Sequence, residues 1–321
     1  HCDPVWLITD KLNCDFRWNT ERFGPRERFV SDLRELGGRL SIWGLPYLDP
    51  ESPRYAEAAE AGHLVRDTEG AIAPMVGTPA PDDRGRALVD LASDAGRRWW
   101  QELHEPFLDD GVAAFKTDFA EGLPDNAVLG DGTPSEHAHN LYPLRYNSAV
   151  SDVIRQRTGR PPLVWARSGW AGSQRYPAQW GGDPESSVAG MRATLRGGLS
   201  FALSAPGLWS HDVGGFFGSD LTPELYVRWT QFGALSPLMR AHGLSAREPW
   251  AFGERVLSLA RDWIRLRYSL LPYLWQVAHE AQRCGWPMLR PLALECPDDP
   301  VAASVDDLAH GVRERGHLAQ A

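Results

Sequence analysis

Five short hydrophobic segments along this chain end in charged or polar residues that stand beside aromatic residues and glycines. They end at Lys116–Glu121, Ala166–Ser168, Trp180–Asp183, Trp209–Phe216 and Met239–Gly243. Burying a charge costs several kcal/mol unless the charge is paired. A salt-bridged strand end would explain any one of these segments taken alone. Five in series predict strand ends that converge on one pocket.

Strand-like segments alternate with helical patterns, and this alternation predicts an α/β fold with a parallel sheet. Strands are expected at 5–9, 40–45, 112–115 and 163–166, and helices at 26–37, 97–108, 142–158, 191–203, 225–238 and 256–282. Two glycines weaken the helix at 191–203, and Pro272 is expected to kink the last helix. Long polar loops are expected near 46–90 and 119–138.

The polar residues always follow the strand, which is where a (β/α)8 TIM barrel carries its active site. A doubly wound sheet would present the same pattern at its switch point. No G-x-G-x-x-G or Walker loop follows a strand, so the dinucleotide-binding version is disfavoured. We expect one barrel domain over 1–299 and an unrelated tail over 300–321.

Composition narrows the functional classes. The 321 residues carry a net charge of −9 and no basic patch, which argues against a nucleic-acid partner. No apolar stretch has the length of a membrane span. The four cysteines form no C-x-x-C pair, so we expect no zinc site and a cytoplasmic location. Several of the 14 tryptophans stand beside the charged strand ends, where such rings could stack on sugars.

Asp118 and Asp183 would end different strands of one barrel. Cleaving a glycosidic bond requires an acid for the leaving oxygen and a carboxylate against the developing positive charge. A cation beside Asp118, either Arg167 or Lys116, would favour its charged form. A metal-dependent hydrolase is the alternative, with ligands imagined among His137, His139, His211, Asp212 and His242, although a histidine is more often a packed residue than a ligand.

At these motifs the chain resembles glycoside hydrolase family 31, the α-xylosidase and α-glucosidase group. The resemblance rests on Lys-Thr-Asp-Phe-x-Glu at 116–121, Ala-Arg-Ser at 166–168, Trp-Gly-Gly-Asp at 180–183, Ser-His-Asp-Val-Gly-Gly-Phe at 210–216 and Arg-x-His-Gly at 240–243. It runs from residue 1 to about residue 299, and the first motif is most similar to the bacterial α-xylosidase branch.

The resemblance implies a retaining exo-α-glycosidase without metal or organic cofactor, acting on an oligosaccharide or α-glycoside. Asp118 would be the nucleophile and Asp183 the general acid and then base. The implied sugar-binding residues are Asp3, Trp43, Lys116, Arg167, Trp180, Asp212, Phe216 and His242. Family members often form oligomers, so a homo-oligomer is a further expectation.

The chain departs from the family pattern in three places. Ala120 stands where the branch usually has glycine, and Pro4-Val5 stands where α-xylosidases often have Cys-Phe. The first barrel strand and a β-sandwich domain would precede His1, so a truncated catalytic domain is expected. An α-glucosidase, a sulfoquinovosidase and an inactive carbohydrate-binding fragment stay open as alternatives.

Overall fold

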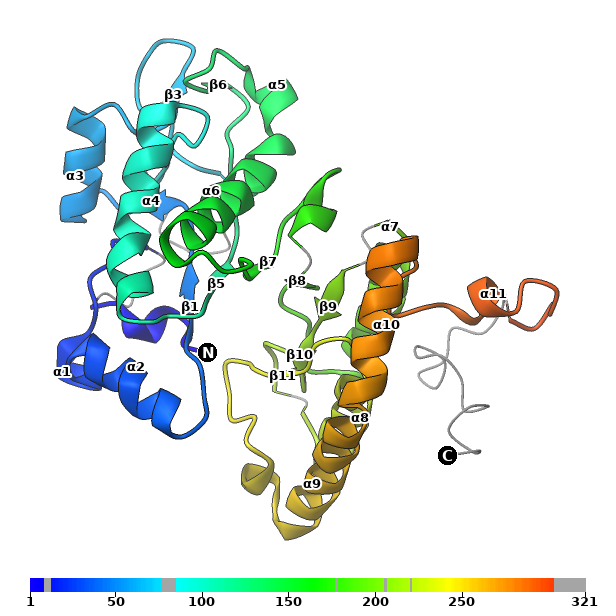
Figure 1. The fold of residues 1–321 in the computed structure, drawn as a ribbon. Coiled ribbons are helices and arrows are strands. Elements are labelled where there is room, and N and C mark those ends of the chain that lie inside the picture. Colours follow the sequence, from blue (N-terminus) through cyan, green and yellow to red (C-terminus); the bar gives the residue numbers. More distant parts are fainter. Residues whose placement is uncertain (9–12, 77–84, 177, 205–206, 220, 303–321) are drawn as a thin grey trace. The chain divides into compact units, whose positions relative to one another are not determined.

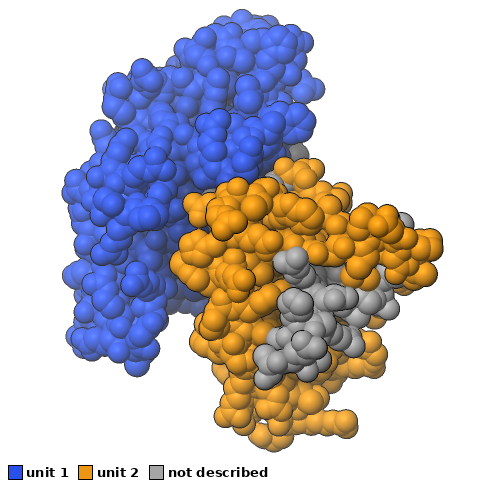
Figure 2. All heavy atoms as spheres, turned by 45° about the vertical axis from the view of Figure 1, so that its right-hand side comes forward, with its two compact units in different colours: residues 1–176 blue, residues 177–321 orange. Residues whose placement is uncertain are grey.

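The computed structural model describes residues 1–8, 13–76, 85–176, 178–204, 207–219 and 221–302 (Figure 1). The chain divides into two compact units, residues 1–176 and residues 177–321 (Figure 2). The expected tail from residue 303 onwards lies outside the described residues, and the expected boundary at residue 299 stays a prediction.

Unit 1 is built on three parallel strands, β1 (Ser41–Gly44), β5 (Ala114–Thr117) and β7 (Val164–Ala166). Gly44, Thr117 and Ala166 lie opposite one another in the register, so the three strands end along one edge. All four residues of β5 are buried, which suits a parallel strand covered on both faces. The predicted strands at 40–45, 112–115 and 163–166 are confirmed within two residues.

Helices connect these strands, as the alternation predicted. Helix α4 (Asp94–Asp109) precedes β5, and α6 (Leu141–Thr158) precedes β7; the two helices pack side by side, and α6 also contacts both strands (Figure 1). Ser93 begins α4 by accepting a hydrogen bond from the backbone N–H of Gly96, and left-handed Gly159 ends α6. The shorter helices of this unit are α1 (Thr20–Phe23), α2 (Arg26–Glu35), α3 (Pro53–Glu60), α5 (Ser135–Ala138) and the 3-10 helix η2 (Ser173–Arg175).

The segments predicted as long loops contain short regular elements that the sequence did not indicate. The loops expected near 46–90 and 119–138 contain strand pairs, β2 (Tyr47–Leu48) with β4 (Ala87–Leu88) and β3 (Arg66–Asp67) with β6 (Ala127–Val128). Several of their large apolar side chains, among them Leu48, Leu64, Leu88, Leu123 and Leu129, are buried, a fact that the polar composition of these segments conceals.

In the described part of the strand expected at 5–9, Val5 and Trp6 belong to a 3-10 helix, η1 (Pro4–Trp6), and only Leu7 forms a β-bridge, antiparallel to Trp18. Proline has a fixed φ and no backbone N–H, so it begins this turn rather than continuing a ladder. The position that pairs with the parallel sheet lies earlier, at Cys2, which bridges Ile42 of β1 in parallel.

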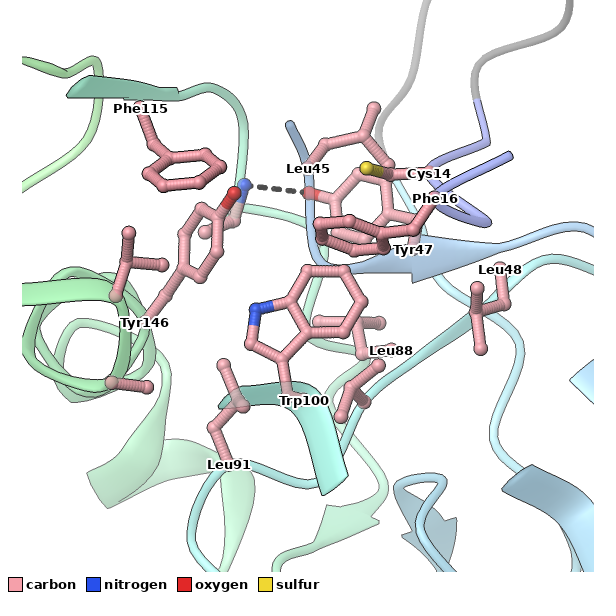
Figure 3. Close-up of a cluster of buried hydrophobic side chains, with 14 of the residues drawn as sticks. Cys14, Phe16, Leu45, Tyr47, Leu48, Leu88, Leu91, Trp100, Phe115 and Tyr146 are labelled. Carbon is pink, nitrogen blue, oxygen red and sulfur yellow. Dashed lines mark hydrogen bonds between the residues drawn. The ribbon is translucent and has the colours of Figure 1, made fainter. Parts of the chain in front are cut away.

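Aromatic side chains pack with aliphatic ones in the core of unit 1 (Figure 3). Trp100 of α4 is fully buried; its ring centroid lies 5.1 Å from that of Phe16 and 6.3 Å from that of Tyr146. Trp6 and Trp43 are also buried. Much of the tryptophan content therefore belongs to packing.

Unit 2 repeats the strand–helix–strand pattern twice. Helix α7 (Val188–Ser204) connects the parallel strands β8 (Ala178–Trp180) and β9 (Leu208–Ser210). Helix α8 (Pro223–Leu235) connects β10 (Asp212–Val213) and β11 (Arg240–Ala241), which are also parallel. The remaining elements are η3 (Pro249–Phe252), α9 (Glu254–Ser269), α10 (Leu271–Cys284) and α11 (Leu292–Glu295). No helix in the described part of the chain is both long and apolar enough to span a membrane.

The expected kinked helix at 256–282 is two helices, α9 and α10, that meet at Leu270. Pro272 lies in the first turn of α10, where no intrahelical partner for its missing N–H is required. The proline therefore begins a helix instead of kinking one.

Helix α7 continues through Gly197 and Gly198, and the two glycines differ in their surroundings. A Cβ atom on Gly198 would lie 2.4 Å from the Trp209 ring, whereas one on Gly197 would meet nothing within 4 Å. Gly198 thus lets Trp209 of β9 lie directly against the helix, while Gly197 has no packing role.

We predict opposite effects of alanine at these two positions. Gly198→Ala should destabilise unit 2 by roughly 1–3 kcal/mol because the methyl group overpacks against an indole. Gly197→Ala should stabilise it by roughly 0.5–1 kcal/mol through helix propensity. Urea unfolding of both variants checks this, and equal effects would contradict the packing role of Gly198.

Candidate active site

Asp118 follows the last residue of β5, and its carboxylate is held on both oxygens. Trp43 donates from Nε1 to Oδ2 at 2.8 Å, and the backbone N–H of Phe119 donates to Oδ1 at 2.8 Å. Two cations lie beside it, with Arg167 Nη1 3.0 Å from Oδ1 and Lys116 Nζ 3.4 Å from Oδ2. Both cations that the sequence suggested as alternatives are therefore present, and they offset the cost of burying this charge.

Asp3 joins the same group through Lys116, whose Nζ lies 2.9 Å from Asp3 Oδ1. Cys2 pairs with the residue before Trp43 on β1, and this bridge brings Asp3 to the edge where the strands end. The structure thus gathers Asp3, Trp43, Lys116 and Arg167 around Asp118, within unit 1. Their contact with sugar stays a prediction.

Glu121 is a residue that the site assignment from sequence missed. It accepts two hydrogen bonds from Arg167, with Nε to Oε1 at 2.9 Å and Nη2 to Oε2 at 3.1 Å. The Arg167 guanidinium also lies over the Phe119 ring, 3.8 Å from its centroid. Arg167 is therefore fixed between two carboxylates. The sequence does contain a signal for Glu121, because this residue is the last position of the Lys-Thr-Asp-Phe-x-Glu motif.

The backbone after Asp118 turns through two left-handed residues, Phe119 with φ 59° and Ala120 with φ 83°. Tyr47 supports this turn because its hydroxyl accepts hydrogen bonds from the backbone N–H groups of Ala120 and Gly122, at 2.9 and 3.2 Å. Burial raises the pKa of Tyr47, so the hydroxyl stays protonated. A left-handed alanine is strained, and this strain lies next to the candidate nucleophile.

Asp183 lies in unit 2, three residues after the end of β8, and is exposed. Gly182 before it has φ 77°. The chain after it is held by main-chain hydrogen bonds, from Phe216 N–H to the Pro184 carbonyl at 2.6 Å and from Ser186 N–H to the Phe217 carbonyl at 2.7 Å. The candidate acid therefore stands on a loop that is docked along residues 216–217.

Arg240, another residue missed from sequence, connects two of the predicted site residues of unit 2. It forms a buried ion pair with Asp212, and its guanidinium lies 5.3 Å from the centroid of the buried Trp180 ring. Phe216 stacks on His242 with ring centroids 5.4 Å apart. These contacts order the side chains on unit 2, and the sugar-binding role of each stays a prediction.

The histidines do not support the metal alternative in the described residues, where no group of three or more His, Cys, Asp or Glu side chains could hold an ion. His211 is buried in the core of unit 2. Trp229 donates from Nε1 to its Nδ1 at 3.0 Å. Ser236 donates its own proton to the Phe232 carbonyl, so its Oγ accepts from His211 Nε2 at 3.0 Å. Both ring nitrogens are thus occupied, and the ring is the neutral Nε2–H tautomer.

Burial, with a smaller contribution from the positive charge of Arg240, lowers the pKa of His211 from 6.5 to about 3. Between these two values the unfolded chain binds a proton that the folded chain does not bind. Stability should therefore fall as the pH falls through this window, and the dependence should vanish above it.

We predict that His211→Gln, which does not titrate, flattens this dependence by about 1.4 kcal/mol per pH unit. Urea unfolding of wild type and variant between pH 6 and pH 5 measures the difference in slope. Equal slopes would show that His211 accepts a proton in the folded state.

A further prediction concerns the strained turn at Phe119 and Ala120. Ala120 and Ala149 of α6 are both fully buried, so replacing either by glycine removes one buried methyl group. Only Ala120→Gly also relieves a left-handed backbone, so it should be less destabilising than Ala149→Gly by about 1–2 kcal/mol. Urea unfolding of the two variants gives this difference, and the reverse order would contradict the strain.

The Glycosyl hydrolases family 31 TIM-barrel domain model matches residues 1–277. An alpha-xylosidase of Emericella nidulans is 37% identical over 93% of this chain and 38% of its own length. An alpha-glucosidase of Bacillus thermoamyloliquefaciens is 32% identical over 88% of this chain and 38% of its own length. This chain thus spans less than half of these relatives.

Solved structures agree with this result. A family 31 alpha-xylosidase from a soil metagenome, complexed with xylose, has a TM-score of 0.85 at 26% identity, over 95% of this chain and 49% of that one. A family 31 dextranase of Flavobacterium johnsoniae, complexed with glucose, has a TM-score of 0.84 at 30% identity, over 95% of this chain and 39% of that one. The predicted (β/α)8 fold class is confirmed, and the chain belongs to glycoside hydrolase family 31.

Proposed function

We propose that this chain is the catalytic part of a retaining α-glycosidase that removes terminal α-linked xylose. One observation carries the proposal: the Asp118 carboxylate is buried at the end of a parallel strand and held on both oxygens, by Trp43 and by the Phe119 backbone N–H. A carboxylate fixed in this way is prepared to attack one carbon atom with little loss of freedom. The relatives named alpha-xylosidase support the same activity.

Two displacement steps follow from the two carboxyl groups. Asp118 attacks the anomeric carbon while Asp183 gives its proton to the leaving oxygen, and a glycosyl ester with Asp118 forms. Asp183 then takes a proton from water, which attacks the same carbon and releases Asp118. The exposure of Asp183 supports its part, since such a group can exchange protons with solvent between the two steps.

Xylose is favoured over glucose by two similar alpha-xylosidases, one of Emericella nidulans and one of Lactiplantibacillus pentosus, each 37% identical to this chain. Glucose is the second candidate, supported by the alpha-glucosidase at 32% identity and by the dextranase structure that holds glucose. In both cases the Asp3 carboxylate, held by Lys116, would accept hydrogen bonds from hydroxyls at the non-reducing end. A cytoplasmic location is part of the proposal, supported by the free thiols of Cys2, Cys14, Cys284 and Cys296.

We predict that Asp118→Ala lowers kcat on p-nitrophenyl α-xyloside by at least about 10⁴-fold, because no covalent intermediate can form. Azide should restore turnover, since a small anion fits the space left by the carboxylate, and the product should be the β-glycosyl azide. Product anomers are read by proton NMR.

Asp109→Ala is the control, because Asp109 pairs with Arg157 on the surface of unit 1. An Asp118→Ala variant with wild-type activity would remove Asp118 from its role. The same assay with p-nitrophenyl α-glucoside distinguishes the two sugars. Sugar binding without turnover of either substrate would instead support the non-catalytic fragment.

A further inference from the structure

Arg247 lies in the loop that follows β11, and it is only 4% exposed. Its guanidinium binds the Gly215 carbonyl twice, from Nε at 3.0 Å and from Nη2 at 2.6 Å. Nη2 also donates to Ser186 Oγ at 3.1 Å. One side chain therefore connects the segment that carries Asp183 with the turn at Gly214-Gly215.

The third nitrogen of the guanidinium completes the arrangement. Nη1 donates to Ser245 Oγ at 2.6 Å and to the carbonyls of Ser245 and Ala246, each at 3.0 Å. Tyr226 of α8 donates its hydroxyl proton to the Arg247 carbonyl at 2.6 Å, and its ring stacks on Phe252. The backbone of Arg247 is thereby tied to the core of unit 2.

Three motif glycines make room for these contacts. A Cβ atom on Gly243 would lie 2.6 Å from Arg247 Cζ, and one on Gly214 would lie 3.0 Å from Arg247 Nε. A Cβ atom on Gly215 would lie 2.6 Å from Ser186 Cα. The glycines of the Val-Gly-Gly-Phe and Arg-x-His-Gly motifs thus allow the arginine and the Asp183 segment to approach.

We infer that Arg247 is a positioning residue for Asp183. It holds residues 184–186 against the Gly215 turn and so sets the place from which Asp183 transfers its proton. Ser186, which accepts the hydrogen bond from Arg247, is fully buried and lies three residues after Asp183. A displacement of Ser186 would therefore also displace the Asp183 carboxyl group. The inference rests on the proposed role of Asp183, and a misplacement of about 1 Å can cost about 10²-fold in rate.

Arg247→Met tests the inference, because methionine keeps an apolar stem and removes every guanidinium hydrogen bond. Arg267→Met is the matched control. Arg267 lies half-buried in unit 2 and, like Arg247, donates to backbone carbonyls, here those of Ala234, Ser236 and Pro237, away from the Asp183 segment. The two variants should lose similar thermal stability, so they separate a general structural role from positioning.

The first measurement is hydrogen–deuterium exchange, which requires no activity. Peptides covering 184–190 and 214–219 should exchange at least about 10-fold faster in Arg247→Met and unchanged in Arg267→Met. Ser186→Ala removes one contact while leaving the arginine in place, and it should raise exchange in the same peptides. Unchanged exchange in both Arg247→Met and Ser186→Ala would overturn the inference.

The second measurement compares kcat/KM for an aryl α-xyloside with a good leaving group and for one with a poor leaving group. Asp183→Ala sets the scale, because loss of the acid spares activated substrates. Arg247→Met should shift the ratio in the same direction by about 10-fold or more, Arg247→Lys should shift it less, and Arg267→Met should leave it unchanged.

A ratio that shifts in Asp183→Ala but not in Arg247→Met would overturn the positioning role. A ratio unaffected by Asp183→Ala itself would instead remove Asp183 as the acid, and faster exchange in Arg247→Met would then still support the anchoring of the segment.

Discussion

The buried carboxylate of Asp118 is the constraint on which the organisation of unit 1 depends. Its charge is matched by Lys116 and Arg167, and each of these cations is matched in turn by a further carboxylate, Asp3 or Glu121. The five side chains form a line of alternating charge. An ion inside a protein costs several kcal/mol unless every partner is in place, so the line links the N-terminal segment, β5 and β7 to one another.

This arrangement also explains why the residues around the carboxylate are so strictly placed. The backbone must turn through Phe119 and Ala120 for Phe119 N–H to reach Asp118, and Tyr47 binds the two N–H groups that the turn leaves inside. Backbone strain next to a reactive group is typical of functional sites. The strained turn and the charge line together keep Asp118 in one position.

In unit 2 the candidate catalytic residue is positioned by different contacts from those around Asp118. The candidate acid, Asp183, is exposed, and the backbone that follows it is held by main-chain hydrogen bonds to residues 216–217. Two buried arginines hold the loops of this unit in place. Arg240 orders Asp212 and Trp180, while Arg247 connects Ser186 to Gly215. An arginine can bind several oxygens at fixed angles, which lysine cannot do, and this suits it to join loops that come from different parts of the chain.

The amino-acid sequence by itself determined the strand–helix alternation, the edge at which the site lies, the two candidate carboxylates and the family, because periodicity and short motifs are local properties. It misplaced the first strand, since Pro4 begins a turn, and it missed the strand pairs within the polar loops. Only the tertiary structure decided that Glu121 fixes Arg167, that His211 is a neutral core residue, and that Arg247 reaches Ser186. These contacts join residues that are distant in the chain. His211 and Ser236 are 25 positions apart, Glu121 and Arg167 are 46 positions apart, and Ser186 and Arg247 are 61 positions apart. Such partners are selected by how the elements pack, and no local pattern encodes that packing.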